Sequence, residues 1–208
     1  MNRFATSAAI LLLAATSAFA AGRPPASSIA STNPATVIAG AYVIEPSHTR
    51  VQFSVLHMGF TNWNGDFTGV SGSLNLNPNN VAASMLDISV PVASVSTTNA
   101  KLDGELKSAD WLDAARFPTM HFVATKIIRA GNNKATITGS LTLHGVTRPV
   151  VLAAVFNGAG VNPMDKNYTV GFDATTKIRR SDFGIMTLVP VVGDETNIHI
   201  SVAFEKTK

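Results

Sequence analysis

The sequence predicts an all-β protein whose strands form an antiparallel barrel, and three features of the chain carry this prediction. From Tyr42 onward the apolar residues recur with a period of two, turn residues separate the alternating runs, and one helical segment interrupts them. Strict alternation is typical of a sheet with one apolar face. Short connections between about eight or nine such runs favour an antiparallel meander over a parallel α/β sheet.

Each expected strand places apolar residues at alternate positions. Turn residues at 77–80, 131–133 and 144–145 lie between neighbouring runs, as hairpin loops require. In chain order, the apolar faces consist of Val51, Phe53, Val55 and His57; Leu74 and Leu76; Leu86, Ile88 and Val90; Met120, Phe122 and Ala124; Ile137, Gly139, Leu141 and Leu143; Val150, Leu152, Ala154 and Phe156; Val170, Phe172, Ala174, Thr176 and Ile178; and Ile198, Ile200, Val202 and Phe204.

Residues 99–112 break the alternation and form the expected helical part of the fold. Leu102 and Leu106 are one helical turn apart, and Ser108 is a residue type that commonly caps a helix N-terminus. We expect one or two short helices here, with the sheet starting again at Phe117.

The edges of such a sheet must be protected, and the long strands with a single helical segment favour a closed barrel over two packed sheets. An eight-stranded barrel has an interior that is either filled by side chains or wide enough for one ligand. Gly139, Ala154, Ala174 and Thr176 are small residues on the expected inner faces. They are compatible with a tapered, packed core and with a cavity, so the alternation alone leaves both interpretations open.

The composition is that of a globular protein without thiol chemistry. Apolar residues make up 46% of the 208 residues and charged residues 14%, which is enough apolar material for a core. The net charge of +3 and the lack of a basic run give no support to nucleic-acid binding. The absence of cysteine excludes disulfides, thiolate metal sites and a cysteine nucleophile.

The first twenty residues have the pattern of a cleaved secretory signal. Arg3 gives a positive start, a short apolar run follows, and Ala18 and Ala20 fill the small positions before a cleavage site. We therefore expect residues 1–20 to be a signal peptide, 21–40 a flexible linker, and 41–208 the barrel domain. The mature protein is expected to be periplasmic or secreted, without stable membrane insertion, because no second long apolar segment follows.

The histidines and known motifs give little support to a catalytic or metal site. None of the five histidines forms a His-x-His or His-Glu-x-x-His pair, and no nucleophile elbow, phosphate loop or dinucleotide fingerprint occurs. We expect no metal and no cofactor, although a zinc site assembled from distant strands stays open. His57 shares the parity of Phe53 and Val55, which predicts an inward histidine at the barrel rim.

A basic cluster at residues 177–182 has two interpretations. Lys177 and Arg179 have the parity opposite to Phe172 and Ile178, which predicts an outer, solvated face. The alternative is a cationic group at the barrel mouth that meets an anionic head group.

Several sequence blocks follow one another across nearly the whole expected domain. They are YVIEPSH at 42–48, a strand at 53–59 ending in HMG, KSADWLD at 107–113, FP at 117–118, GSLTLHGVTRPV at 139–150, IRRSDFG at 178–184 and VGDE at 192–195. Each block alone is weak, but their number and order make the set specific. On these blocks the chain from about Tyr42 to Lys206 resembles the YceI family of exported lipid-binding proteins.

The resemblance implies an extended, lipocalin-like barrel of eight antiparallel strands, with a long apolar channel for a polyisoprenoid or another long-chain amphiphile. It thereby favours the hollow interior that alternation left open. Similar family members commonly carry a histidine between the Asp and Leu of the helical segment, where this chain has Glu105. The head-group preference therefore cannot be carried over from the family. The neighbouring Gly104 weakens a helix by about 1 kcal/mol relative to Ala.

Our leading hypothesis is an exported, non-enzymatic carrier of a polyisoprenoid (an isoprenoid quinone or its precursor) or of a fatty acid or amide. One alternative is an enzyme that acts on such a lipid with His57 as acid or base. Another is a module that docks a membrane enzyme through an exposed apolar patch. The sequence does not decide whether the protein forms a homodimer. The residues expected to bind the ligand are Val51, Phe53, Val55, His57, Leu86, Ile88, Phe122, Leu141, Leu143, Leu152, Phe172 and Ile200.

Overall fold

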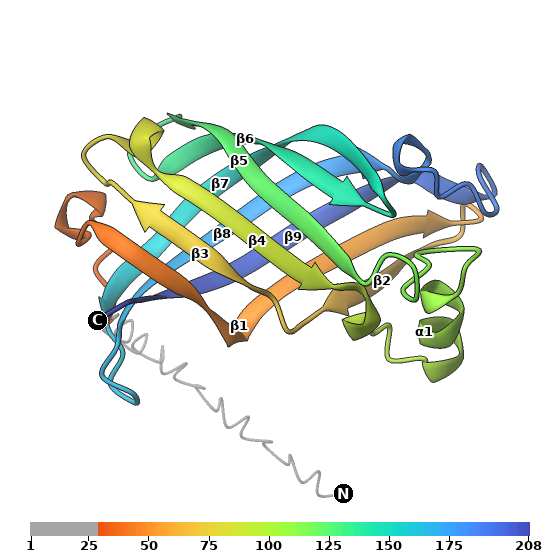
Figure 1. Ribbon diagram of the computed structural model, residues 1–208, viewed down its shortest axis with the longest axis horizontal. Coiled ribbons are helices and arrows are strands. Elements are labelled where there is room, and N and C mark those ends of the chain that lie inside the picture. Colours follow the sequence, from red (N-terminus) through yellow and green to blue (C-terminus); the bar gives the residue numbers. More distant parts are fainter. Residues whose placement is uncertain (1–28) are drawn as a thin grey trace, which may run out of the picture.

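The computed structural model describes residues 29–208, so the expected signal peptide lies outside the described residues. Long antiparallel strands run diagonally around one elongated barrel, and the helix lies at one of its ends (Figure 1). The strands are β1 (Gly40–His57), β2 (Thr61–Phe67), β3 (Ser71–Leu76), β4 (Met85–Pro91), β5 (Thr119–Arg129), β6 (Lys134–Leu143), β7 (Val146–Val161), β8 (Tyr168–Arg179) and β9 (Val192–Lys206). The helical segments are α1 (Ala100–Lys107) and the 3-10 turns η1 (Pro34–Thr36), η2 (Val81–Ala83), η3 (Val92–Ser94) and η4 (Arg180–Phe183).

The barrel closes because β1 also pairs with β9, the last strand of the sheet. Around the barrel the strands follow the order β2-β1-β3-β4-β5-β6-β7-β8-β9, with every pairing antiparallel. β2 pairs with the second half of β1, and β3 pairs with its first half. These two short strands therefore share one position around the barrel, with Gly69 at a φ of +64° in the bend between them. The predicted eight-stranded antiparallel barrel is confirmed.

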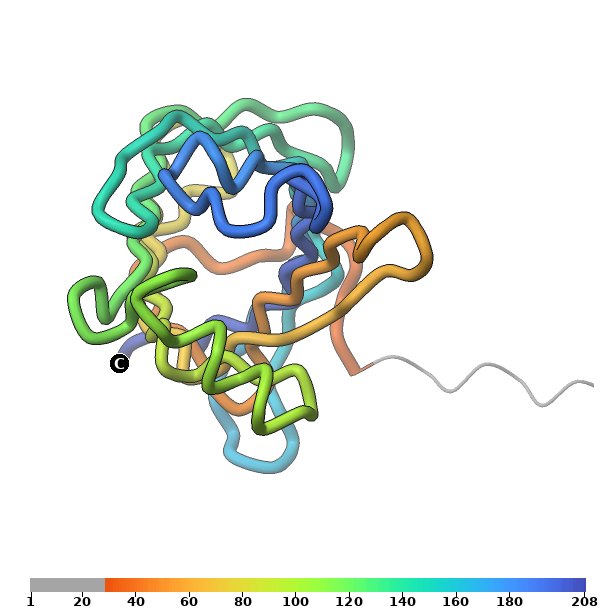
Figure 2. Tube along the Cα trace, turned by 90° about the vertical axis from the view of Figure 1, so that its right-hand side faces the viewer, coloured from red at the N-terminus to blue at the C-terminus, as the bar shows by residue number. Residues whose placement is uncertain are grey.

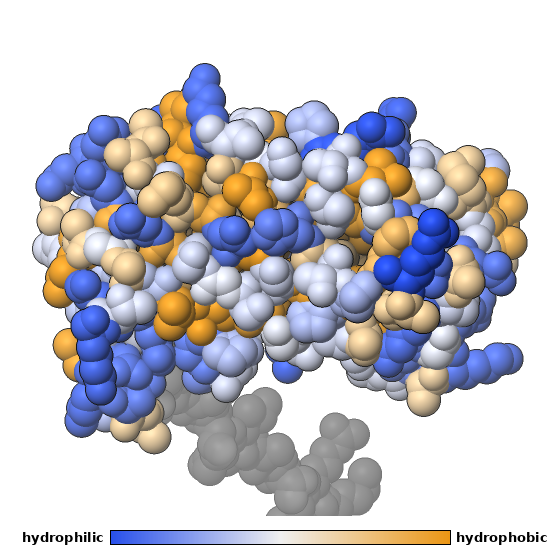
Figure 3. Space-filling view, viewed as in Figure 1, coloured by the Kyte–Doolittle hydropathy of each residue, from blue (hydrophilic) through white to orange (hydrophobic). Residues whose placement is uncertain are grey.

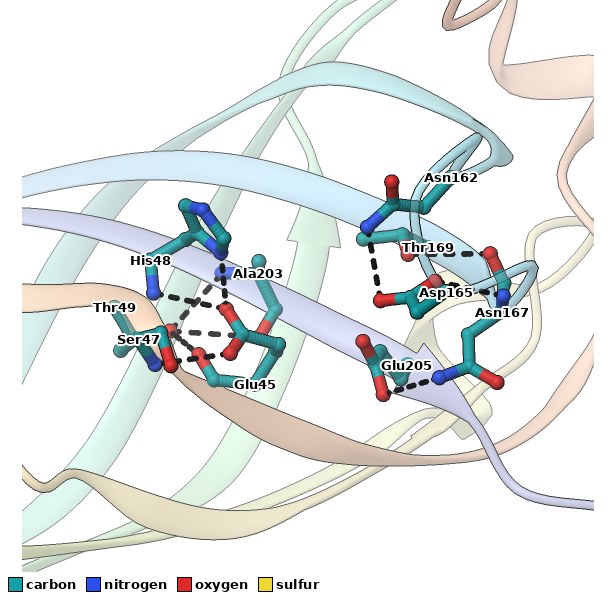
Figure 4. Close-up of polar contacts among 10 residues, drawn as sticks. All are labelled: Glu45, Ser47, His48, Thr49, Asn162, Asp165, Asn167, Thr169, Ala203 and Glu205. Carbon is teal, nitrogen blue, oxygen red and sulfur yellow. Dashed lines mark hydrogen bonds and ion pairs between the residues drawn. The ribbon is translucent and has the colours of Figure 1, made fainter.

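β1 bends after Glu45, where its pairing with β9 shifts register. The Glu45 carboxylate accepts hydrogen bonds from the backbone N–H of Ser47 and His48 and lies 2.5 Å from His48 Nδ1 (Figure 4). Burial acts to raise the pKa of Glu45, but these hydrogen bonds outweigh it and lower the pKa. The buried Thr49 hydroxyl donates to Glu45 O and accepts from Ala203 N–H. The bend thus leaves His48 in solvent and turns Thr49 inward.

The helical segment contains one α-helix, and its position differs from the expected cap. The Asn99 side chain caps the start of α1 by accepting from the N–H groups of Lys101 and Leu102. Ser108 lies at the C-terminal end of α1, so the prediction that it begins a helix is wrong. Its carbonyl accepts from Trp111 N–H at 3.1 Å, which closes a short turn in place of a second α-helix.

The later part of the expected linker packs against the barrel. Ser31 and Ala159 exchange two backbone hydrogen bonds, of 2.8 and 2.9 Å, and Val37 is buried. The Tyr42 hydroxyl donates to Ile38 O. Residues 31–38 therefore lie on the barrel in the positions where we expected a free tether.

The outer surface carries apolar side chains in separate patches among polar ones, as one face shows (Figure 3). Further exposed apolar side chains lie on the β1–β2 turn and in the loop between β8 and β9, among them Met58, Phe60, Met186 and Leu188. No helix within residues 29–208 is long and apolar enough to cross a membrane.

Candidate functional site: an apolar cavity along the barrel

The barrel encloses a cavity of about 350 Å³ whose wall comes from all nine strands and from both ends. This volume lies at the lower end of the range of ordinary ligand pockets, roughly 300–1,000 Å³. In the view along the barrel, α1 and the β8–β9 loop lie on opposite sides of the end that faces the viewer (Figure 2). We call this the helical end. The opposite end, built by the β3–β4 connection (77–84) and the β5–β6 turn (130–133), is the hairpin end (Figure 1).

Eleven of the twelve residues predicted to bind the ligand line this cavity. They are Val51, Phe53, Val55, Leu86, Ile88, Phe122, Leu141, Leu143, Leu152, Phe172 and Ile200. Their alternation with outward polar residues is the reason that the sequence could identify them. Whether these side chains contact a bound lipid stays a prediction.

His57 is the predicted site residue that does not line the cavity. It is the last residue of β1, beside a register shift in the pairing with β9, and there the β1–β2 hairpin continues past the wall. Its ring packs against Trp63 with the ring centroids 5.7 Å apart. Glu105, at the position where similar proteins carry histidine, is exposed and likewise does not line the cavity.

Aromatic rings line the middle part of the cavity wall. Phe172 lies between Phe156 and Phe204, with ring centroids 5.6 and 6.3 Å away. On the other side, the Phe122 ring lies over Gly139 of the neighbouring strand, where a Cβ would come within 2.3 Å of Phe122 Cζ. A side chain at residue 139 would therefore displace this ring, which explains why a small residue occupies that inward position.

Arg180 is a buried cation on the cavity wall at the helical end, only 7% exposed. Burial lowers the pKa of its guanidinium, and the nearby Asp194 carboxylate acts in the opposite direction. The guanidinium lies 5.4 Å from the centre of the Trp111 ring. Its N–H groups donate to four backbone carbonyls at 2.7–3.1 Å, those of Gly193, Ile185, Thr187 and Val192. Arg180 thus fixes the β8–β9 loop across this end.

Asp194 completes the polar contacts of the helical end. Its carboxylate accepts from the Ser181 N–H at 2.9 Å and from the Ser181 hydroxyl at 2.7 Å. Burial acts to raise the pKa of Asp194, but the hydrogen bonds from Ser181 and the charges of Arg180 and Arg179 outweigh it and lower the pKa. The charged carboxylate therefore holds the start of the β8–β9 loop through its hydrogen bonds with Ser181.

The hairpin end of the cavity wall carries several polar residues, four of which are exposed. These residues are Arg129, Asn132, Asn133 and Lys134. Arg129 Nη2 donates to Pro78 O at 2.8 Å and thereby ties the β5–β6 hairpin to the β3–β4 connection. A bulge in β5 after Ala124 shifts the parity, so that Ile127 and Arg129 face the cavity.

The sequence did not single out Arg129 and Lys134, which the cavity wall includes. It placed Arg180, the third cation of the wall, only within the basic cluster at 177–182. Arg180 has the parity of Ile178, so the period of two already pointed it inward. Arg129 lies beyond the β5 bulge, which the sequence does not reveal. Lys177 and Arg179 are exposed, in agreement with the outer face predicted for them, and Lys177 Nζ pairs with Glu195 at 2.7 Å.

Metal ligands do not cluster in the described part of the chain. Within residues 29–208, no three His, Asp or Glu side chains come together in a way that could hold a metal ion. His121 instead pairs with Asp87 on the outer face at 2.7 Å, and His144 Nδ1 contacts Phe183 O at 3.1 Å.

Comparisons with known proteins agree with this architecture. The profile of the YceI-like domain matches residues 42–204. A UPF0312 protein of Vibrio vulnificus is 36% identical over 169 residues, which cover 80% of this chain and 87% of that protein. The crystal structure of Burkholderia cenocepacia BcnA superposes with a TM-score of 0.70 at 25% identity, covering 77% of this chain and 98% of BcnA. A polyisoprenoid-binding domain from Saccharophagus degradans shares the fold at 11% identity, with a TM-score of 0.64 over 82% of this chain and all of that domain. The chain therefore belongs to the YceI-like domain family.

Proposed function

We propose that the protein is an exported carrier that holds a long apolar chain, a polyisoprenoid or an acyl chain, in its barrel cavity without catalysis. The observation that carries this proposal is the continuous apolar wall from Val37 near the hairpin end to Ile185 at the helical end. Such a wall favours a ligand that is apolar along its length, because each buried methylene contributes about 0.8 kcal/mol. The polyisoprenoid-binding domain of the same fold supports this choice of ligand class.

The length of the barrel strands supports a chain of several isoprene units. A ten-residue strand spans roughly 33 Å, and most strands of this barrel are at least that long. Affinity does not identify the chain, because non-covalent binding saturates near roughly −18 to −21 kcal/mol. The chain length is therefore best read from the bound lipid itself.

The chemistry of the wall supports a binding role over an enzymatic one. No His, Asp or Glu side chain lines the cavity within residues 29–208. These are the residue types that most often transfer protons in catalysis. His57, the acid or base of the enzyme alternative, packs against Trp63 away from the cavity. We accordingly propose that binding needs neither a metal nor a cofactor.

Export is part of the proposal and rests on the N-terminal sequence. Ala18 and Ala20 occupy the small positions of a cleavage site, so the mature chain is expected to begin at Ala21. The intact mass of the protein recovered from the periplasm or medium tests this start. A recovered chain that still carries residues 1–20 would contradict it.

Mass spectrometry of the lipid extracted from purified protein tests the carrier function. Ala174 is buried, lines the cavity and faces Ala154 across the sheet, so Ala174→Trp fills the cavity without adding charge. The indole would occupy space that the lipid needs, so that the lipid-bound form would be overpacked. Because overpacking costs about 1–3 kcal/mol, we expect about tenfold less bound lipid. Thr175→Trp, on the exposed face of the same strand, is the matched control and should retain the wild-type amount. Wild-type protein free of lipid, or equal lipid in Ala174→Trp, would refute the proposal.

A further inference from the structure

Six exposed apolar side chains lie at the helical end of the barrel, outside the cavity. They belong to the β1–β2 hairpin and the β8–β9 loop, which touch each other where Met58 N–H donates to Val191 O at 3.0 Å. We call this group the tip patch, and it consists of Leu56, Met58, Phe60, Met186, Leu188 and Val191. None of the six lines the cavity, so lipid binding inside the barrel does not account for their exposure.

The chain segments that form the tip patch carry no charged side chain. Residues 51–65 and 183–193 contain no Asp, Glu, Lys or Arg, although these residue types make up 14% of the whole chain. The β1–β2 hairpin projects sideways from the barrel (Figure 2), and Phe60 at its turn is 84% exposed. A contiguous exposed apolar patch marks a surface that binds a membrane or a protein.

Two residues of the tip patch have a backbone conformation that bulky side chains rarely adopt. Met58 and Leu188 have φ angles of +53° and +58°. Met58 and Gly59 are the central residues of a turn that closes with a hydrogen bond of 3.0 Å from Phe60 N–H to His57 O. Because φ is positive at both central residues, this turn favours Asn over Met at the first of them. Local folding therefore does not explain Met58 and Leu188, which points to a role for their exposed side chains at the surface.

The size and the charge of the tip patch favour a lipid bilayer over a protein as its partner. A specific protein–protein interface uses roughly 20–30 residues a side, whereas the tip patch has six exposed apolar residues. A fluid bilayer needs no matching shape, and its apolar interior suits the two uncharged segments that carry the patch. Trp63, which is partly exposed, lies on the same hairpin, and Trp is enriched at membrane interfaces.

We propose that the tip patch enters the surface of a lipid bilayer and thereby holds the helical end of the barrel on a membrane without crossing it. This inference goes beyond the carrier function, because it concerns the outer surface and not the cavity. In the docked protein, Met58, Phe60 and Leu188 lie at the boundary between head groups and acyl chains, where their apolar surface is removed from water. Docking in this way brings the helical end of the barrel close to the lipids of the membrane.

The test measures how much of the mature protein sediments with vesicles of phosphatidylcholine. The triple variant Met58→Asn, Phe60→Gln, Leu188→Asn removes three exposed apolar side chains and places Asn at both positive φ angles. We expect its partition coefficient to be about tenfold lower than that of the wild type, because less apolar surface leaves water. Its thermal stability should be equal or higher, since Asn tolerates a positive φ better than Met or Leu.

A matched control removes exposed apolar side chains elsewhere on the barrel. The variant Met85→Gln, Ile128→Gln, Met164→Gln changes three exposed residues on β4, β5 and the β7–β8 turn. It should sediment with the vesicles as the wild type does. Phe60→Gln alone, at the most exposed residue of the tip patch, should reduce sedimentation by less than the triple variant does. This single variant keeps the test valid if the triple variant is less stable than expected.

Three results would overturn the inference. The first is wild-type protein that stays in the supernatant, or that sediments only when the vesicles also contain the anionic phosphatidylglycerol. The second is equal sedimentation of the triple variant and the control. The third is a wild-type dimer, measured by light scattering without vesicles, that the triple variant converts to a monomer, because the tip patch would then bind a second copy of the chain. Lack of lipid in the cavity would refute the carrier function and leave the sedimentation result unchanged.

Discussion

The two ends of the barrel use their cations in different ways. At the helical end, Arg180 is buried with Phe183 and Ile185, which are 1% and 4% exposed, and its donors are taken up by backbone carbonyls. At the hairpin end, Arg129 and Lys134 are exposed. A buried cation must find its partners within the protein, whereas an exposed one is hydrated.

This difference assigns a direction to the cavity. If the proposed chain enters at the hairpin end, we expect it to pass apolar residues and to end near the hydrogen bonds of Arg180. The residues 31–37 add Pro34 and Val37 to the wall at the hairpin end, through backbone pairing of Ser31 with Ala159.

The largest effect is expected for Phe172→Asp, in the middle of the wall. A carboxylate at this position must be desolvated or protonated among Phe156 and Phe204, and either costs several kcal/mol. We expect the variant to lose bound lipid, measured by mass spectrometry of the extracted protein. The matched control Thr175→Asp, on the exposed face of β8, should keep its lipid.

Circular dichroism and thermal unfolding have to show that Phe172→Asp retains its sheet. A folded Phe172→Asp protein with the wild-type amount of lipid would show that the chain does not lie along this wall. Loss of lipid in both variants would mean that a charge on either face of β8 is enough to prevent lipid binding. The result would then give no support to contact between the inner wall and the lipid.

The second largest effect is expected for Arg180→Met, which removes the charge and its donors but keeps an apolar side chain of similar length. Four backbone carbonyls, two in the β8–β9 loop and two at the start of β9, lose their hydrogen-bond donor at buried or partly buried positions. The free energy of unfolding should fall by about 3–5 kcal/mol, measured by denaturant unfolding. Arg179→Met, at an exposed position, is the control and should change it by less than about 0.5 kcal/mol. Equal effects of the two variants would contradict the structural role assigned to the buried Arg180.

Most of the fold was predictable, because the alternation of apolar and polar residues can be read from the sequence. The barrel then turns the apolar positions of each strand inward. The inward faces of β6, β7 and β9 follow the predicted parity over their whole central parts, as Leu141, Leu152 and Ile200 show. The joint position of β2 and β3 was not predictable, because it depends on the pairing of both with the long β1. Ser108 illustrates the same limit, since a capping residue type fits either end of a short helix segment.

The apolar part of the site was predictable and the polar part was not. Phe53 and Phe172 follow from parity alone, whereas His57 has the right parity but lies where the hairpin leaves the wall. Arg129 faces the cavity only because of the bulge after Ala124, and bulges leave no clear signal in one sequence. The polar groups of this cavity are thus placed by irregular backbone, which a periodic pattern does not reveal.

A smaller effect is expected from acid, through Asp194 at the helical end. Its pKa is lower in the folded protein than in the unfolded chain, so its contribution to stability is present above the ordinary Asp pKa, about 4. This contribution is lost as the pH falls below about 4 and through the folded pKa. Asp194→Asn should make the free energy of unfolding less dependent on pH in this window. Ser181→Ala removes one hydrogen bond to the carboxylate and should move the loss to higher pH. An acid dependence unchanged in both variants would contradict the assignment.

The smallest effect is expected for Lys177→Asp, just outside the helical end. Lys177 is exposed and pairs with Glu195, which is also exposed, so the substitution replaces a solvated ion pair by two solvated carboxylates. Such a change costs less than about 1 kcal/mol, because water and salt screen both charges. The folded variant should therefore retain the wild-type amount and kind of lipid, compared by mass spectrometry with the protein purified in parallel. A changed lipid composition would show that the basic cluster at 177–182 contacts the ligand after all.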